Sequence, residues 1–244
     1  EDLYKAGGSQ RIFYELRDFL YLDAKSVNGT TLGEEIKNSA KWTQNIITDK
    51  SNPVFNAGSI AVLKGTLAPN SAIIKQSAAT ESLLIHEGRA VVFEGLEDLA
   101  NRIDRDDLDV TKDDVLVLKS IGPKGGPGMP EAGLIPIPKK LAKQGVKDMV
   151  RISDGRMSGT ASGTIILHVT PESYENGPLA IVENGDLIKL DVPKRKIDLM
   201  ISEEEIAERL LKRKELSIRR RGYNKIYMEH VTQADRGVDF DFLI

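Results

Sequence analysis

A single carboxylate stands near the end of a run that is rich in glycine and proline. The run GPKGGPGMPEAG spans residues 122–133 and holds five glycines, three prolines and Glu131. Glycine lets a backbone approach a ligand closely, and proline stiffens the turns between the glycines. The run matches neither common phosphate-binding pattern, because it lacks G-x-x-x-x-G-K-[ST] and because Glu131 replaces the last glycine of G-x-G-x-x-G. A carboxylate held in this way suits a hard cation such as Mg²⁺; the alternative is a tight turn with an exposed glutamate.

A second run, SDGRMSGTASGT at residues 153–164, carries the hydroxyl groups of Ser158 and Thr160 among small residues. Hydroxyl and backbone N–H groups can bind the carboxylate of a small anionic substrate. A serine can also act as a nucleophile or base where its pKa is lowered. The run contains no G-x-S-x-G pattern, and no histidine–aspartate pair has a readable relation to Ser158. The alternative is a turn between strands, in which Asp154 and Arg156 pair with each other.

Composition excludes several classes of protein and site. The chain has 244 residues, 40% of them hydrophobic and 29% charged, with a net charge of −3, which is ordinary for a globular protein and does not suggest nucleic-acid binding. No apolar run approaches the roughly 18 residues of a membrane span. The absence of cysteine excludes thiol catalysis and thiolate-bound metals or clusters within this chain. The polar start does not resemble a signal peptide, so we expect a cytoplasmic protein.

The pattern along the chain predicts a mainly β fold with flanking helices. Helical spacing is seen at residues 9–20, and Thr31 with Glu34 predicts a capping box. Short apolar runs separated by turns then predict strands, at 59–65, 72–77, 89–95, 114–120, 164–169, 179–183, 186–192 and 196–201. Helices are predicted at 97–104, 137–145 and 202–213, the last with a capping box of Ser202 and Glu205. Many short strands with few helices favour a barrel-like β domain over alternating βαβ units.

These features predict three regions, namely 1–57, 58–201 and 202–244. The first reads as the last helices of an α/β domain followed by a linker, the second as the barrel-like domain, and the third as a helix with a docking tail. His168 lies within an apolar strand, so it is predicted to be structural rather than a metal ligand.

Taken together, the runs resemble the C-terminal part of the dihydroxy-acid and sugar-acid dehydratase family, which includes 6-phosphogluconate dehydratase. The resemblance spans nearly the whole chain, through DLYKAGG, SVNGTTLGEEI, GPKGGPGMPEAGLIPIPKKL, RISDGRMSGTASGTIILHVTPESYENGPLAIVENGD and EHVTQADRGVDFDFL. It implies a large α/β/α N-terminal domain that precedes this chain and a barrel-like C-terminal domain. It also implies dehydration of a 2,3-dihydroxy acid to a 2-keto-3-deoxy acid, with an iron–sulfur cluster and Mg²⁺.

By this resemblance Glu131 is a ligand of Mg²⁺, and Ser158 is the base that takes the proton from C2. Thr160 is a weaker candidate for holding the substrate. The cluster cysteines and the other Mg²⁺ ligands would belong to the N-terminal domain, so we expect this chain alone to be inactive. The family is typically dimeric or tetrameric, and no nucleic acid or membrane partner is expected.

The motif details favour one substrate class. GMPEAG, RMSGTASG and the DFDFL ending are more similar to pentonate dehydratases, which act on arabinonate or xylonate, than to branched-chain enzymes, which tend to carry GRFSGG in place of GRMSGT. The alternatives are a branched-chain dihydroxy-acid dehydratase of valine and isoleucine biosynthesis, a non-catalytic module that binds a small anion, and a structural domain whose tail drives oligomerisation.

Overall fold

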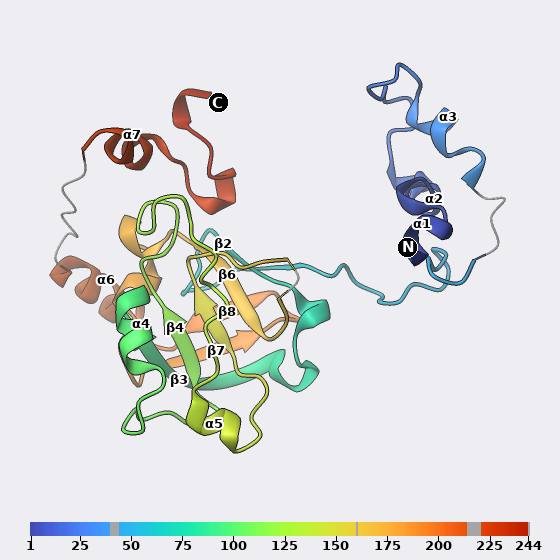
Figure 1. The fold of residues 1–244 in the computed structure, drawn as a ribbon. Coiled ribbons are helices and arrows are strands. Elements are labelled where there is room, and N and C mark those ends of the chain that lie inside the picture. Colours follow the sequence, from blue (N-terminus) through green and yellow to red (C-terminus); the bar gives the residue numbers. More distant parts are fainter. Residues whose placement is uncertain (40–43, 160, 214–220, 244) are drawn as a thin grey trace. The chain divides into compact units, whose positions relative to one another are not determined.

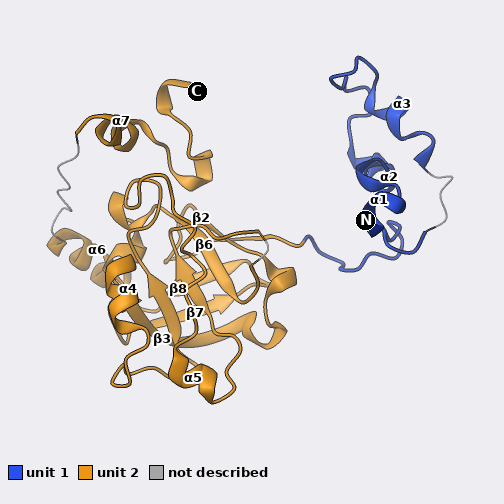
Figure 2. Cartoon of the chain, in the orientation of Figure 1, with its two compact units in different colours: residues 1–58 blue, residues 59–244 orange. Residues whose placement is uncertain are grey.

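The computed structural model describes residues 1–39, 44–159, 161–213 and 221–243 (Figure 1). These residues divide into two compact units, Glu1–Gly58 and Ser59–Ile244, which Figure 2 colours separately. Among the described helices, none is long and apolar enough to cross a membrane. The assignment of residues 1–57 to an α/β domain and of 202–244 to a docking region stays a prediction.

The first unit is a small helical region with little buried surface. It contains α1 (Asp2–Lys5), α2 (Gly8–Glu15), η1 (Arg17–Phe19) and α3 (Leu32–Ile36). The predicted capping box is confirmed at α3, because the Thr31 side chain accepts from the Glu34 backbone and the Glu34 side chain accepts from the Thr31 backbone. Within residues 1–39 and 44–58 the buried residues are Ala6, Ile36 and Ser39. Large apolar side chains are exposed instead, including Tyr4, Phe13, Phe19, Tyr21 and Phe55.

The second unit is built on one eight-stranded sheet in the order β1-β2-β6-β5-β4-β3-β7-β8. The strands are β1 (Ala61–Leu63), β2 (Ser71–Ile74), β3 (Ile85–Phe93), β4 (Val115–Leu118), β5 (Arg151–Ser153), β6 (Ile165–Thr170), β7 (Leu187–Asp191) and β8 (Lys196–Leu199). The two outer strands are also linked, since Lys64 forms a bridge with Lys196 and the Lys64 N–H donates to Arg195 at 3.0 Å. The predicted barrel-like β domain is therefore confirmed.

Four neighbouring strands run parallel, which the sequence pattern did not predict. β3 pairs parallel with β4, β4 with β5, and β5 with β6. A parallel pair needs a crossover connection. α4 (Leu96–Arg102) supplies one between β3 and β4, and a long loop with α5 (Lys139–Lys143) supplies another between β4 and β5. The barrel thus contains the βαβ connectivity that the few predicted helices had argued against.

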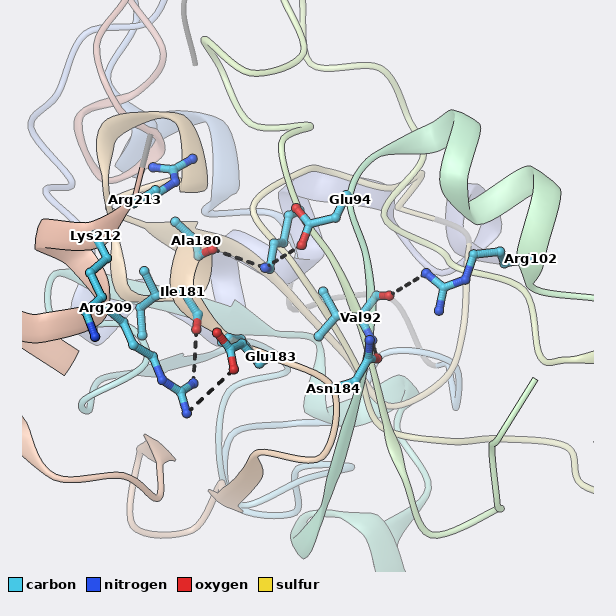
Figure 3. Close-up of a pocket in the computed structure, with 12 residues that line it drawn as sticks. Val92, Glu94, Arg102, Ala180, Ile181, Glu183, Asn184, Arg209, Lys212 and Arg213 are labelled. Carbon is cyan, nitrogen blue, oxygen red and sulfur yellow. Dashed lines mark hydrogen bonds and ion pairs between the residues drawn. The ribbon is translucent and has the colours of Figure 1, made fainter. Parts of the chain in front are cut away.

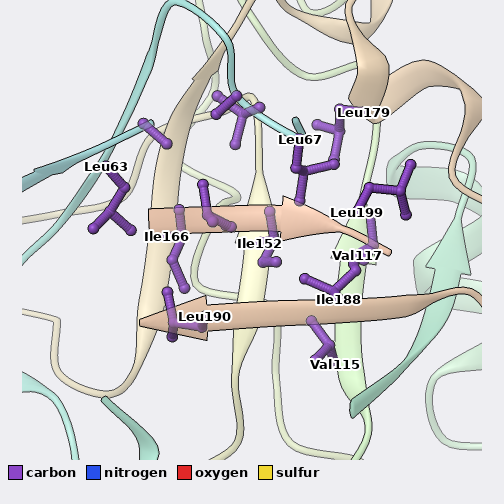
Figure 4. Packing of buried hydrophobic residues seen from close by; sticks show 14 of the residues in the cluster. Leu63, Leu67, Val115, Val117, Ile152, Ile166, Leu179, Ile188, Leu190 and Leu199 are labelled. Atoms are coloured by element: carbon purple, nitrogen blue, oxygen red, sulfur yellow. The ribbon is translucent and has the colours of Figure 1, made fainter. Parts of the chain in front are cut away.

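Two hydrophobic cores lie on opposite faces of the parallel strands. Val115 and Val117 of β4 belong to the larger core inside the barrel, whereas Leu116 and Leu118 belong to a second core that includes Leu99 of α4 and Leu141 of α5. Figure 4 shows the larger core, where β7 and β8 cross over β4, β5 and β6 with buried side chains between them. Burial on both faces explains why β4 reads VLVL rather than alternating with polar residues.

Two sequence predictions of local structure were wrong. Residues 179–183 do not form a strand, because Pro178 begins the 3₁₀ helix η6 (Pro178–Ile181), in which Leu179 and Ile181 are buried. β5 was not predicted, since its three residues, Arg-Ile-Ser, are too short and too polar to stand out. Before its C-terminal region this unit also contains the short 3₁₀ segments η3 (Gln76–Ala78), η4 (Glu81–Leu83) and η5 (Ser173–Glu175).

The C-terminal region begins with α6 (Glu203–Lys212). The Ser202 side chain caps this helix by accepting from the Glu205 N–H at 3.1 Å. Only half of the predicted box is described, because the Glu205 carboxylate accepts from Arg209 instead, at 2.6 Å. Residues 221–243, which we call the tail, contain α7 (Tyr223–His230), η7 (Ala234–Arg236) and η8 (Asp241–Leu243).

Candidate functional site

The two unusual runs follow neighbouring parallel strands. Residues 120–133, which we call the glycine-rich loop, come after β4, and residues 154–163, which we call the hydroxyl loop, come after β5. Leu118 and Ser153, the last residues of these strands, are paired in register. Because the carboxyl ends of parallel strands meet at one edge of a sheet, the two loops leave the barrel side by side. They are joined by backbone, since the Gly133 N–H donates to the Arg156 carbonyl at 2.8 Å.

Glu131 pairs with Arg156 across the two loops. An Nη1–Oε1 distance of 2.7 Å joins them, and their side chains are 50% and 43% exposed, respectively. The Arg156 Nε also donates to the Met129 carbonyl, at 2.5 Å. The predicted alternative, an Asp154–Arg156 pair, is therefore wrong. A half-exposed carboxylate can still reach a ligand from the solvent side, so the geometry holds Glu131 in place without burying it.

Asp154 fixes the start of the glycine-rich loop from beneath. It is completely buried, and its carboxylate accepts from the backbone N–H groups of Ser120, Ile121 and Ser173 at 3.3, 3.0 and 2.9 Å. Burial raises the pKa of Asp154, and these backbone donors only partly oppose the rise. The aspartate of the DGR sequence thus acts on the neighbouring loop.

Glu172 holds the next part of the same loop and was missed in the sequence. It is completely buried, and its carboxylate accepts from the Lys124 and Gly125 N–H groups, each at 2.9 Å. Burial raises the pKa of Glu172, and the negative charge of Asp154 adds to the rise. A Cβ atom at Gly122 would lie 2.6 Å from Glu172 Oε2, so glycine is required there for the loop to reach this carboxylate. The only signal for Glu172 in the sequence is that an acidic residue directly follows an apolar strand and Pro171.

The hydroxyl loop carries Ser158 at its middle. The Ser158 carbonyl accepts from the Ala161 N–H at 3.1 Å, which forms a tight turn. The next residue, Gly159, accepts a hydrogen bond at its carbonyl from Lys75 Nζ at 2.7 Å. A Cβ atom at Gly159 would meet nothing within 4 Å, so the turn has open space on that side. Thr160 lies outside the described residues.

The far end of the hydroxyl loop is fixed by Asp148. Its carboxylate accepts from the Thr164 N–H at 2.9 Å, from the hydroxyls of Thr164 and Thr80 at 2.8 and 2.7 Å, and from Arg151 at 2.6 Å. Burial acts to raise the pKa of Asp148, but the hydroxyl, backbone and arginine partners outweigh it and hold this pKa below its usual value.

His168 lies on β6 close to the same end of the barrel. Its backbone is in the left-handed region, with φ of 52°, and its N–H donates to the Gly155 carbonyl at 3.1 Å. Burial lowers the pKa of His168, and the positive charge of Arg156 lowers it further. The imidazole is consequently favoured in its neutral form at pH 7.

The described residues place carboxylates at the two loops but no assembled metal site. Among the described residues, no group of three or more His, Cys, Asp or Glu could hold a metal ion. Asp154 and Glu172 are buried and occupied by backbone donors, whereas Glu131 is half-exposed. Of these three carboxylates, that of Glu131 is the one exposed enough to reach a cation from the solvent side. The chain has no cysteine and cannot ligate an iron–sulfur cluster through thiolates.

A cavity of about 440 Å³ lies elsewhere on the second unit (Figure 3). Lys119, whose side chain is 5% exposed, donates from Nζ to Glu94 at 2.7 Å and to the Ala180 carbonyl at 3.1 Å. Arg209 of α6 reaches across to Asp186 at 2.6 Å and to the Ile181 carbonyl at 3.2 Å. None of the described residues that line the cavity is Glu131, Arg156 or Ser158. The Arg209 contacts fasten α6 to the barrel, and the cavity forms no part of the site described above.

Comparison with known families gives, for most of the chain, the family that the sequence motifs resemble. A model of the family described as "Dihydroxy-acid/6-phosphogluconate dehydratase C-terminal" matches residues 45–238. The chain belongs to this family. The matched range includes both loops and the buried carboxylates that hold them. The predicted resemblance is thereby confirmed.

Three relatives illustrate the range of this dehydratase family. The chain is 45% identical to an L-arabinonate dehydratase from Rhizobium leguminosarum bv. trifolii, with 100% of the chain and 42% of the relative covered. It is 43% identical to an L-arabonate dehydratase from Azospirillum brasilense, with 100% and 44% covered. It is 41% identical to a dihydroxy-acid dehydratase from Carboxydothermus hydrogenoformans, with 98% and 43% covered. The chain thus spans less than half the length of these relatives.

Proposed function

We propose that this chain is the C-terminal domain of a hydro-lyase that dehydrates a 2,3-dihydroxy sugar acid to a 2-keto-3-deoxy acid. The observation that carries the proposal is the family match over residues 45–238 together with the half-exposed Glu131 at the junction of the two loops. Residues of the missing part of the enzyme would complete the active site, so the 244-residue chain alone is expected to be inactive.

In this proposal Glu131 provides one oxygen ligand to Mg²⁺. Arg156 holds the carboxylate at 2.7 Å and so orients it before the cation binds. When bound, Mg²⁺ and an iron–sulfur cluster held outside this chain would supply Lewis acidity at the substrate's carboxylate and hydroxyl oxygens, including the departing C3 hydroxyl. The stiff glycine-rich loop and its two buried carboxylate supports are consistent with a role that requires one oxygen at a fixed position.

Ser158 is proposed as the base that takes the proton from C2 of the substrate. A serine is a weak base at its free pKa and becomes effective only where nearby positive charge favours the alkoxide. Lys75 supports this role, because its ammonium group lies 2.7 Å from the carbonyl of Gly159, the residue after Ser158. Thr160 is proposed to hold the substrate.

The substrate class rests on the relatives. Two of those named act, by their names, on arabinonate, which is a sugar acid. A branched-chain dihydroxy acid is the second candidate, since the dihydroxy-acid dehydratase from Carboxydothermus hydrogenoformans is 41% identical to this chain. If the protein is not an enzyme, the alternative is a non-catalytic module that binds a small anion.

The first partner of this chain is proposed to be its own N-terminal domain. Unit 1 exposes large apolar side chains, among them Tyr4, Phe19 and Tyr21, which are 83%, 70% and 90% exposed. Several large apolar side chains exposed in one small unit are expected where another domain packs against it. A homodimer or homotetramer is the proposed assembly of the complete enzyme.

A 2-keto acid assay on the full-length protein, prepared anaerobically with iron and Mg²⁺, tests the function. The substrates are arabinonate, xylonate, gluconate and 2,3-dihydroxyisovalerate. Glu131→Ala and Ser158→Ala are each expected to lower turnover by at least about a hundredfold, as is usual when a metal ligand or a general base is removed. Asp107→Ala and Ser82→Ala are matched controls at exposed positions and should keep full activity.

The outcomes separate the candidates. Turnover of a sugar acid that is lost in both site variants supports the proposal. Turnover of 2,3-dihydroxyisovalerate alone would replace the substrate but keep the reaction. No turnover of any substrate by protein with a loaded cluster would favour the binding module.

A further inference from the structure

We propose that the tail positions the glycine-rich loop through Gln233, which acts on Glu172. Gln233 would then be a positioning residue for Glu131, acting through Glu172. The catalytic consequence rests on the proposed function, whereas the mechanical link between the tail and the loop does not.

Gln233 and Glu172 form a reciprocal pair. The Gln233 Nε2 donates to Glu172 Oε1 at 2.7 Å, and the Glu172 backbone N–H donates to Gln233 Oε1 at 2.8 Å. Both ends of the side-chain amide are therefore used on one residue. A side-chain amide carries a donor and an acceptor on separate atoms, so it can pair with Glu172 in both directions without a charge of its own.

Glu172 is shared between the tail and the loop. Its Oε1 atom accepts from Gln233 and also from the Lys124 N–H at 2.9 Å, and its Oε2 atom accepts from the Gly125 N–H at 2.9 Å. The side chain is completely buried, so its carboxylate depends on donors from the protein, and the loss of one donor leaves a buried acceptor less satisfied. Removing the Gln233 amide consequently weakens the position of the carboxylate that holds the loop.

The tail is itself shaped to present Gln233. Val231 and Phe240 form a bridge, the Thr232 N–H donates to the Asp239 carbonyl at 2.8 Å, and the Asp239 N–H donates to the Thr232 hydroxyl at 3.0 Å. Val231 is 4% exposed, so its buried side chain anchors residues 231–240 in the second unit. Gln233 thus projects from a constrained turn rather than from a free chain end.

The loop has little freedom to move independently of Glu172. A Cβ atom at Gly122 would lie 2.6 Å from Glu172 Oε2 and 2.9 Å from Glu172 Cβ, so the backbone of the loop is in contact with this side chain. A displacement of Glu172 therefore shifts the segment that leads to Glu131. The sequence alone gives no hint of this link, since Gln233 lies 61 residues from Glu172.

Hydrogen exchange of backbone amides in the full-length protein tests the link without any assay of activity. Gln233→Ala should speed exchange at Lys124 and Gly125 by about tenfold or more, because each depends on the carboxylate that Gln233 holds. Exchange in β3 and β4 should stay unchanged. Asp235→Ala, at an exposed position of η7, is the matched control and should leave the loop unaffected.

A swapped pair distinguishes positioning from simple loss of stability. Gln233→Glu places a second carboxylate against Glu172 and should loosen the loop further, whereas the double variant Glu172→Gln with Gln233→Glu restores an amide–carboxylate pair and should recover part of the protection. In active enzyme, Gln233→Ala should raise the Mg²⁺ concentration for half-maximal rate several-fold.

Unchanged exchange at Lys124 and Gly125 in Gln233→Ala would overturn the proposal, and so would equally faster exchange throughout the barrel. No recovery in the double variant would likewise count against it. An enzyme that shows the exchange result but has no dehydratase activity would support the link and refute the proposed function, so the two failures are distinguishable.

Discussion

The glycine-rich loop and the hydroxyl loop leave the same end of the barrel but are held in different ways. The first is fastened along its first half, because Asp154 and Glu172, both completely buried, accept from four backbone N–H groups at Ser120, Ile121, Lys124 and Gly125. The second is fastened mainly at its ends: Gly155 accepts from His168 and Thr164 donates to Asp148. Gly159, in its middle, is held at its carbonyl by Lys75 Nζ at 2.7 Å and has open space on its Cβ side.

This difference corresponds to the two chemical tasks that we propose. A metal ligand must place one oxygen at a fixed point, so fastening the start of its loop and pairing Glu131 with Arg156 are useful there. A group that meets the substrate needs room beside it, and the open side of the hydroxyl loop provides this room. The carboxylates that support the two loops also differ electrostatically. Burial raises the pKa values of Asp154 and Glu172, which hold the glycine-rich loop, whereas its many donors lower the pKa of Asp148, which holds the hydroxyl loop.

The largest expected effect on stability is at Gly163, where the hydroxyl loop is tightly fastened. A Cβ atom there would lie 2.0 Å from Arg151 Nη2 and 2.8 Å from Asp148 Oδ1, and φ is +125°. Gly163→Ala should therefore lower the free energy of unfolding by about 3 kcal/mol or more and lower the melting temperature by several degrees. Gly159→Ala is the control in the same loop and should change stability by less than about 0.5 kcal/mol. Equal melting temperatures for the two variants would contradict the contrast between fastened ends and open middle.

The opposite pKa shifts predict opposite pH effects. Asp148 has a lowered pKa, so its stabilisation is present above the ordinary aspartate value of about 3.9 and is lost as the pH falls through the folded-state value. Glu172 has a raised pKa, so its burial costs stability above the folded-state value, and this cost is relieved as the pH falls toward about 4.3.

Melting temperatures between pH 7 and pH 3 check this contrast. The amount by which the melting temperature of wild type exceeds that of Asp148→Asn should shrink below about pH 4. The melting temperature of wild type should rise relative to that of Glu172→Gln as the pH falls from 7 toward about 4.3. Parallel pH curves for the two comparisons would show that the two supports are electrostatically alike.

The smallest expected effect on stability is at Arg156. Its pair with Glu131 is 43% and 50% exposed, so screening by water limits its worth, and Arg156→Gln should change stability by less than about 1 kcal/mol. Thermal melting measures this, with Arg105→Gln as a control at another exposed ion pair. A loss of several kcal/mol would mean that Arg156 supports the loop through its contact with the Met129 carbonyl rather than through the ion pair.

Sequence alone determined the parts of this protein that depend on local chemistry. The glycine-rich run, the hydroxyl run, the Thr31–Glu34 capping box and most strands were all readable, because turns, caps and apolar periodicity are set by residues a few positions apart. The motifs also sufficed to recognise the family, which the match over residues 45–238 confirmed.

Only the tertiary structure decided which residues support the site. The partner of Glu131 lies 25 residues away at Arg156, the carboxylate that holds Gly125 lies 47 residues away at Glu172, and Gln233 is 61 residues beyond that. The short β5 brings the first of these pairs together, because it pairs parallel with β4, although its three residues gave no clear signal. An isolated acid such as Glu172 looks the same in a sequence whether it is exposed or buried. Burial is a property of the whole barrel, and it is burial that turns these acids into supports for the loop.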